Sequence, residues 1–136
     1  MILTPMAVVA QASAPTPAPD PDPAVSARAK EWFHRLQTGT LDRSQMTQAA
    51  SDRLSEVAEK WYAQNLGELG DPVSFERYTD PAIVDSTNRY APGPPGSHVY
   101  IYRVRFKNRD IGADFRFCVD DASGKISELS VGLYGV

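Results

Sequence analysis

The stretch GTLDRSQMTQAASDRLSEVAEKWYAQNLGELGDPVSF, residues 39–75, carries the strongest fold signal in the chain. Gly39 is predicted to end the preceding helix. Asp42, with Gln45 three positions later, has the spacing of a helix capping box. Ser51 is then predicted to cap a longer helix. One face of that helix is formed by residues at helical spacing, namely Leu54, Val57, Ala58, Trp61 and Asn65.

The signals continue on both sides of this stretch. Gly67, Gly70 and Pro72 end the long helix, and the alternation that follows predicts a strand over Val73, Phe75 and Arg77. Upstream, Asp22 is predicted to cap an earlier helix with Pro23 at its first position. Its apolar stripe consists of Val25, Ala29, Trp32, Phe33 and Leu36.

The C-terminal part predicts an antiparallel meander in a definite register. A turn at residues 107–110 pairs Val104 with Ala113, Tyr102 with Phe115 and Tyr100 with Phe117, and sets Arg103 against Asp114 on the other face. A second turn at residues 121–125, with Gly124 at positive φ, pairs Phe117 with Leu129, Phe115 with Val131 and Ala113 with Leu133. We therefore expect an α+β fold with a curved sheet, covered by helices through Trp32, Phe33, Leu54 and Trp61.

Composition and the N-terminus define the domain organisation. With 42% apolar and 23% charged residues in 136 positions, one soluble domain is expected over residues 24–136. Residues 1–14 form a short apolar run with small-x-small sites, which predicts an export signal and a periplasmic or extracellular protein. The run is too short to span a membrane, for which about 20 residues are needed. Residues 15–23 have proline at every second position, which predicts an extended linker.

The order of elements resembles that of nuclear-transport-factor-like and ketosteroid-isomerase-like cones, also called cystatin-like. Short segments are similar to a bacterial exported subgroup: Gly39, 41–44, 69–72, 74–75, 102–104 and 124–126. The resemblance implies a cone-shaped domain that often accompanies β-lactamase-related serine hydrolases as an accessory module. This chain has no Ser-x-x-Lys and no Gly-x-Ser-x-Gly motif, so we do not expect it to hydrolyse a substrate itself.

No catalytic set is evident in the sequence, and no cofactor is expected. Two histidines without a cysteine or carboxylate cluster do not predict a metal site, and the net charge of −3 argues against a nucleic-acid partner. Cys118 is the only cysteine, so an internal disulfide is excluded. The residues predicted to line a ligand cavity are Trp32, Phe33, Trp61, His98, Tyr100, Tyr102, Phe115 and Phe117.

Two functional hypotheses follow. The first is an exported, non-catalytic module that binds a small apolar ligand or a protein, either a hydrolase or a second copy of itself, as a monomer or homodimer. The alternative is an isomerase- or cyclase-like enzyme acting on a small hydrophobic molecule, with His98 as base and Tyr100 or Tyr102 as hydrogen-bond donor.

Overall fold

The computed structural model describes residues 20, 22–78, 92–107 and 109–136. The predicted signal of residues 1–14 and most of the linker at 15–23 lie outside these residues. Within them the chain forms four helical segments and then four strands: α2 (Pro23–Thr38), η2 (Arg43–Gln45), α3 (Gln48–Arg53), α4 (Glu56–Gly67), β1 (Pro72–Arg77), β2 (Ser97–Phe106), β3 (Ile111–Asp120) and β4 (Ile126–Gly135).

The strands form one antiparallel sheet in the order β1-β2-β3-β4. The predicted register is confirmed in both meander turns, since Tyr102 pairs with Phe115 and Phe115 pairs with Val131. Arg103 lies opposite Asp114, as expected. Gly124 has φ of 70°, so the second turn uses the left-handed conformation that glycine adopts without steric cost. The α+β class is therefore confirmed.

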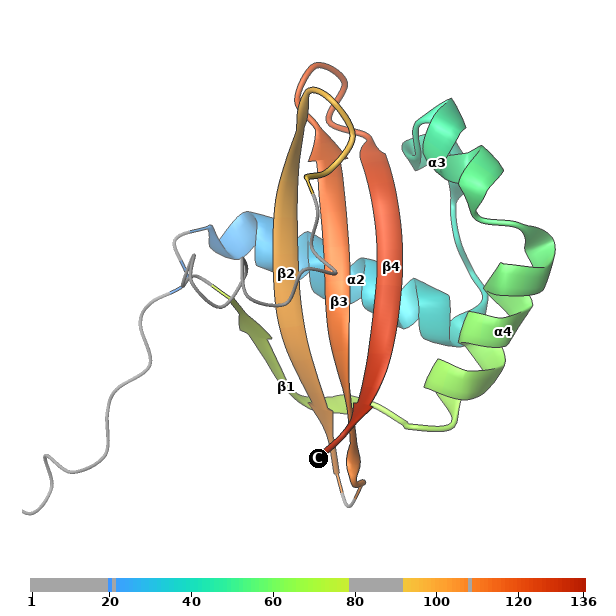
Figure 1. The fold of residues 1–136 in the computed structure, drawn as a ribbon, viewed down its shortest axis with the longest axis vertical. Coiled ribbons are helices and arrows are strands. Elements are labelled where there is room, and N and C mark those ends of the chain that lie inside the picture. Colours follow the sequence, from blue (N-terminus) through green and yellow to red (C-terminus); the bar gives the residue numbers. More distant parts are fainter. Residues whose placement is uncertain (1–19, 21, 79–91, 108) are drawn as a thin grey trace, which may run out of the picture.

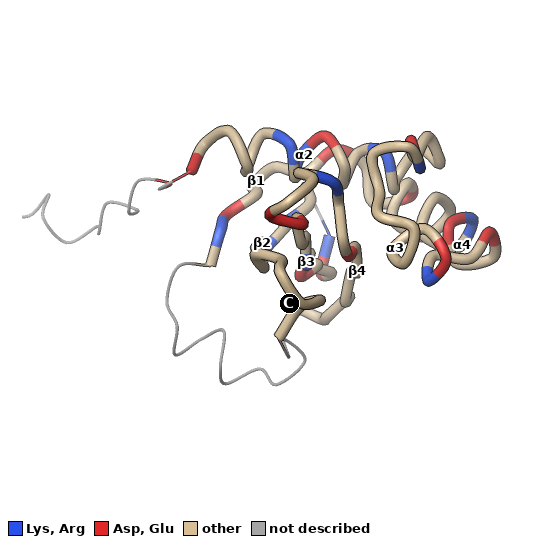
Figure 2. Tube along the Cα trace, turned by 90° about the horizontal axis from the view of Figure 1, so that it is seen from above, with Lys and Arg blue, Asp and Glu red and all other residues tan. Residues whose placement is uncertain are grey.

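Helix α2 crosses one face of the sheet, whereas α3 and α4 lie beyond β4 (Figures 1 and 2). The predicted caps of α2 are present, because the Asp22 side chain accepts from the Val25 N–H and Gly39 has φ of 68°. Its predicted stripe is buried at Ala29, Trp32, Phe33 and Leu36. These side chains join the sheet residues Tyr102, Val104, Phe115 and Phe117 in one core.

The predicted long helix capped by Ser51 is wrong in detail. The chain forms two helices there, with Thr47 capping α3 and Ser55 capping α4, while Ser51 lies inside α3. Both caps accept a backbone N–H three residues later, from Ala50 and Ala58. Ser55, four residues after Ser51, thus caps a new helix. The spacing of the apolar residues alone had predicted one continuous helix.

The predicted sheet-covering role of Trp61 is also wrong. Its side chain is 49% exposed, and Val57 one turn earlier is 80% exposed. Because the break after α3 rotates α4, the α4 residues packed on the core are Ala58, Tyr62 and Leu66. The Trp61 ring packs edge-on against Tyr62, with centroids 5.6 Å apart. Trp61 therefore lies on the outside of the helical layer.

The outer face of the sheet is more covered than its polar sequence suggests. Ile101, Asp114, Arg116 and Cys118 are all buried. Gly93 contributes to this cover, because a side chain at its position would come within 2.7 Å of Val99. The Arg116 Nε donates to Glu128 on the neighbouring strand, so the charges on this face are matched across strands.

Candidate binding groove

Five of the eight predicted cavity residues form packed core in the structure. Trp32, Phe33, Tyr102, Phe115 and Phe117 are each at most 1% exposed. The Phe33 ring alone has three aromatic neighbours, with centroid distances of 5.4 to 6.2 Å to Phe115, Phe75 and Phe106. Rings this close stabilise the fold through contact with one another. Of the five, Phe33 also lines a pocket described below.

The three polar candidates do not converge on one point. The Tyr102 hydroxyl lies 3.0 Å from Ser26 Oγ, and the Tyr100 ring lies under the Arg77 guanidinium at 4.8 Å. His98 Nδ1 lies 2.5 Å from Asp121 Oδ1, and 67% of the His98 side chain is exposed. Burial is the main cause that raises the pKa of both tyrosine hydroxyls, so they remain protonated at neutral pH.

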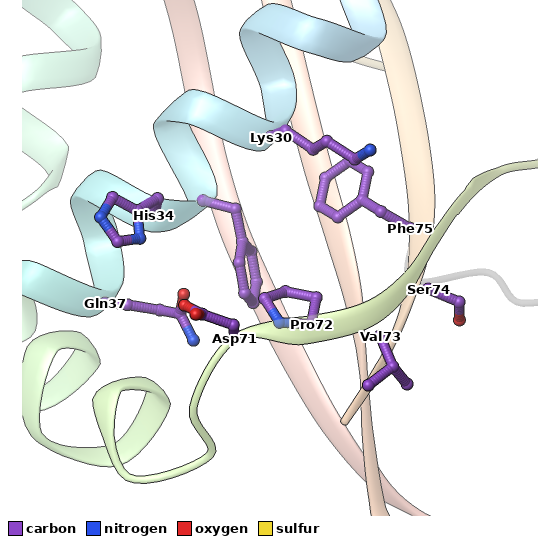
Figure 3. Close-up of a pocket in the computed structure, with 9 residues that line it drawn as sticks. Lys30, His34, Gln37, Asp71, Pro72, Val73, Ser74 and Phe75 are labelled. Atoms are coloured by element: carbon purple, nitrogen blue, oxygen red, sulfur yellow. The ribbon is translucent and has the colours of Figure 1, made fainter. Parts of the chain in front are cut away.

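A pocket of about 400 Å³ lies between α2 and β1 (Figure 3). One wall is a single face of α2, formed by residues at the helical spacing of three, four and seven: Lys30, Phe33, His34 and Gln37. The other wall is the start of β1 and the residue before it, Asp71–Phe75. We call this pocket the α2–β1 groove. Its floor is aromatic, whereas Lys30 and His34 on its rim are exposed.

The α2–β1 groove lies along the edge of the sheet. β1 is the first strand in the sheet order, and no strand among the described residues pairs with its other side. Tyr78 N–H donates to Ile101 O at 2.8 Å, which makes these opposite residues a hydrogen-bonded pair. Since hydrogen-bonded and non-bonded pairs alternate in antiparallel strands, the backbone N–H and C=O of Phe75 and Arg77 point away from β2. The edge thus presents donors and acceptors to an incoming chain.

Gln37 fixes the end of the groove where α4 leads into β1. It is 7% exposed, and its Nε2 donates to Leu66 O at 3.0 Å and to Gly70 O at 2.8 Å. Both carbonyls belong to the end of α4 and the turn after it, where the helix leaves acceptors without partners. One buried amide therefore holds the turn before Asp71 against α2 and sets the width of the groove.

Two further pockets lie around α4. One, of about 190 Å³, lies between the helices and β4 and is lined mainly by apolar side chains, including Leu54, Tyr62 and Leu129. The other is lined by three charged residues, Glu56, Glu59 and Lys60, together with Gly39 and Ala63. None of the three pockets includes His98, Tyr100, Tyr102 or Trp61 in its lining.

The groove residues, apart from Phe33, were missed in the sequence. Lys30, His34 and Gln37 carry no signal of their own in the sequence, because a polar flank of a helix is ordinarily solvated surface. The available signal was the match in spacing between these residues and the aromatic stripe of α2, combined with a short strand directly after Gly70-Asp71-Pro72 that had no predicted neighbour upstream.

Within the described ranges, no group of His, Cys, Asp and Glu side chains is arranged to hold a metal ion. Nor does any helix in this part of the chain combine the length and apolar character of a membrane span. No protein-family model matches the chain, and neither a curated protein nor a solved structure shows significant similarity to it. The case for function therefore depends on the groove itself.

Proposed function

We propose that this protein is an exported, non-catalytic interaction module that binds an extended polypeptide segment in the α2–β1 groove. The observation that carries the proposal is the outer edge of β1, which pairs with no strand of the described residues and lies beside an aromatic-floored groove. Addition of a strand to a sheet edge is a common way of recognising peptides, in which backbone hydrogen bonds provide affinity and side-chain pockets provide specificity.

The composition of the groove supports a polypeptide over a small apolar ligand. Its floor contains Phe33, Pro72 and Phe75, which suit an apolar side chain of the bound segment. Its rim carries Lys30 near Phe75 and Asp71 at the opposite end (Figure 3). Opposite charges at the two ends favour one direction of the bound chain, because each end prefers a residue of complementary charge.

The packed interior weighs against the enzyme alternative. An isomerase of the proposed kind needs a base and a hydrogen-bond donor at one substrate position. His98 is instead paired with Asp121 at the surface, and the Tyr102 hydroxyl contacts Ser26. On this proposal the domain is a filled variant of the cone-shaped fold that its sequence resembles, and it acts outside the cytoplasm as an accessory to another protein.

Selection of peptides on the immobilised full chain tests this function. A displayed library of random segments of about nine residues should yield binders, since an edge strand accepts any backbone that extends along it. Val73 lines the groove and is 61% exposed, so Val73→Arg should fill the groove and weaken binding of a selected peptide by at least about tenfold, or ~1.4 kcal/mol.

Val57→Arg is the matched control, because Val57 is an equally small apolar residue that is 80% exposed on α4, away from β1. It should leave peptide binding unchanged. Equal effects of the two substitutions, or a library without any binder that Val73→Arg weakens, would remove the α2–β1 groove as the binding site.

A further inference from the structure

The pocket of about 190 Å³ beside β4 has apolar walls that the fold leaves partly uncovered. Its walls include Leu54 of α3, Ala58 and Tyr62 of α4, and Leu129 of β4, and we call it the β4 pocket. Leu54 is buried, whereas the other three pack on the core but are only partly buried. A cavity of about 150 Å³ with apolar walls holds a benzene-sized molecule, so the β4 pocket suits an apolar group of about six carbon atoms.

The lining of the β4 pocket also contains a cation with donors to spare. Arg53 Nη1 lies 3.9 Å from Glu128 Oε1, which is beyond hydrogen-bond distance, and 60% of the Arg53 side chain is exposed. Both residues belong to the lining. The Arg53 guanidinium makes no hydrogen bond to any described residue, so its N–H groups are available to a ligand.

The carboxylate of Glu128 is already held by a second arginine. Glu128 Oε2 accepts from Arg116 Nε, and Arg116 is 6% exposed with an Nη1 that finds no acceptor in the described part of the chain. A buried guanidinium is stable only when it is paired, so Arg116 has the stronger claim on Glu128. Asp52 precedes Arg53 in α3, but adjacent helical residues do not face each other. The charge of Arg53 is therefore left for a ligand.

We propose that the β4 pocket binds a small monocarboxylate with an apolar tail. The tail packs between Ala58, Tyr62 and Leu129, and the carboxylate accepts from the Arg53 guanidinium, whose planar fork of donors matches the two carboxylate oxygens. The lining shares no residue with the α2–β1 groove, so this site is independent of the proposed peptide binding.

Titration of the full-length chain with hexanoate, followed by its amide resonances, tests the proposal. Hexanoate should shift the resonances of Ala58, Tyr62 and Leu129 in a saturable way, with a Kd on the order of 1 mM, as is usual for so small a ligand. Hexan-1-ol has the same chain without the charge. It should bind about tenfold more weakly, because it lacks the charge-assisted hydrogen bonds to Arg53.

Two substitutions of Arg53 separate the effect of its charge from a structural role. Arg53→Gln should raise the Kd for hexanoate about tenfold and leave the Kd for hexan-1-ol unchanged. Arg53→Lys keeps the charge and should retain most of the affinity. Lys60→Gln is the matched control, because Lys60 is an exposed cation on α4 that lines the neighbouring pocket instead. It should bind hexanoate as the wild type does.

Four results would overturn the proposal. The first is the absence of any saturable shift with hexanoate, and the second is a set of shifts centred on Phe33 and Phe75 in the α2–β1 groove. The third is equal affinity of the wild type for hexanoate and hexan-1-ol. The fourth is an Arg53→Gln variant that loses affinity for both compounds alike, or that binds hexanoate no more weakly than Lys60→Gln does.

Discussion

Phe33 of α2 meets Phe75 of β1 edge-on, with ring centroids 5.9 Å apart and planes inclined at 69°. This contact joins the helix to the edge strand and forms the floor of the α2–β1 groove. The same pair of side chains thus contributes to stability and to the proposed site, so the two properties can be tested together.

Phe75→Ala should lower the free energy of unfolding by about 3 kcal/mol, because it removes a half-buried ring from contact with Phe33 and Tyr102. Val73→Ala, two positions away at an exposed site, should cost less than about 0.5 kcal/mol. Urea unfolding followed by tryptophan fluorescence measures both. A loss in Phe75→Ala no greater than in Val73→Ala would show that the edge strand is not packed on α2.

The two tryptophans should differ sharply in their contribution to stability. Trp32 is 1% exposed, so Trp32→Ala is expected to cost about 3 to 5 kcal/mol, whereas Trp61→Ala at a half-exposed ring should cost about 1 kcal/mol. Thermal and urea unfolding of the two variants give the comparison. Equal losses of stability in the two variants would show that Trp61 is packed in the core, as its spacing in the sequence predicts.

The sequence was sufficient for the sheet because its register is fixed by two constraints that agree. Turn lengths pair Tyr102 with Phe115, and the same pairing sets Arg103 opposite Asp114. A slip by one residue would move every apolar side chain to the other face. The two caps of α2, Asp22 and Gly39, could also be predicted from the sequence, because each residue type suits one particular backbone position.

The sequence was not sufficient to predict the structure where one local pattern fits two different backbone arrangements. Leu54 to Asn65 has the spacing of one helix, yet Ser55 starts a new helix and turns Trp61 outwards. The groove was missed for a different reason. Lys30 and His34 belong to a site only because β1 passes beside α2, and that proximity is set by tertiary packing and not by local sequence.

Gly124 in the turn between β3 and β4 should be sensitive to the smallest side chain. Its φ of 70° disfavours any residue with a Cβ, although no heavy atom lies within 4 Å of where that Cβ would be. Gly124→Ala should therefore cost about 1 kcal/mol through backbone strain alone. Gly135 also has open space but is not at positive φ, so Gly135→Ala should be neutral in the same unfolding assay.

The Cys118 thiol should be inert in the folded protein. Burial raises its pKa from 9.0 to about 12, with a further contribution from Glu128, whose carboxylate accepts from the thiol. At pH 8 the thiolate fraction of Cys118 is then roughly a thousandfold lower than that of an ordinary thiol. The rate of its reaction with iodoacetamide should be lower by at least the same factor.

Unfolding in urea should restore normal labelling of Cys118. Because the folded pKa lies above the unfolded value, the stabilising contribution of this thiol is complete below pH 9 and is lost as the pH rises from 9 towards 12. Rapid labelling of the native chain at pH 8 would contradict the buried position of Cys118 on the outer sheet face.

Peptide binding in the α2–β1 groove can be located with a map of the amide resonances that change when a library-selected peptide is added to the full-length chain. Binding in this groove should shift the resonances of Lys30 and His34 on α2 and slow hydrogen exchange at Phe75 and Arg77 on the edge of β1. Changes centred instead on Tyr62 and Leu129 in the pocket beside β4, or on His98 and Asp121, would contradict binding in the α2–β1 groove.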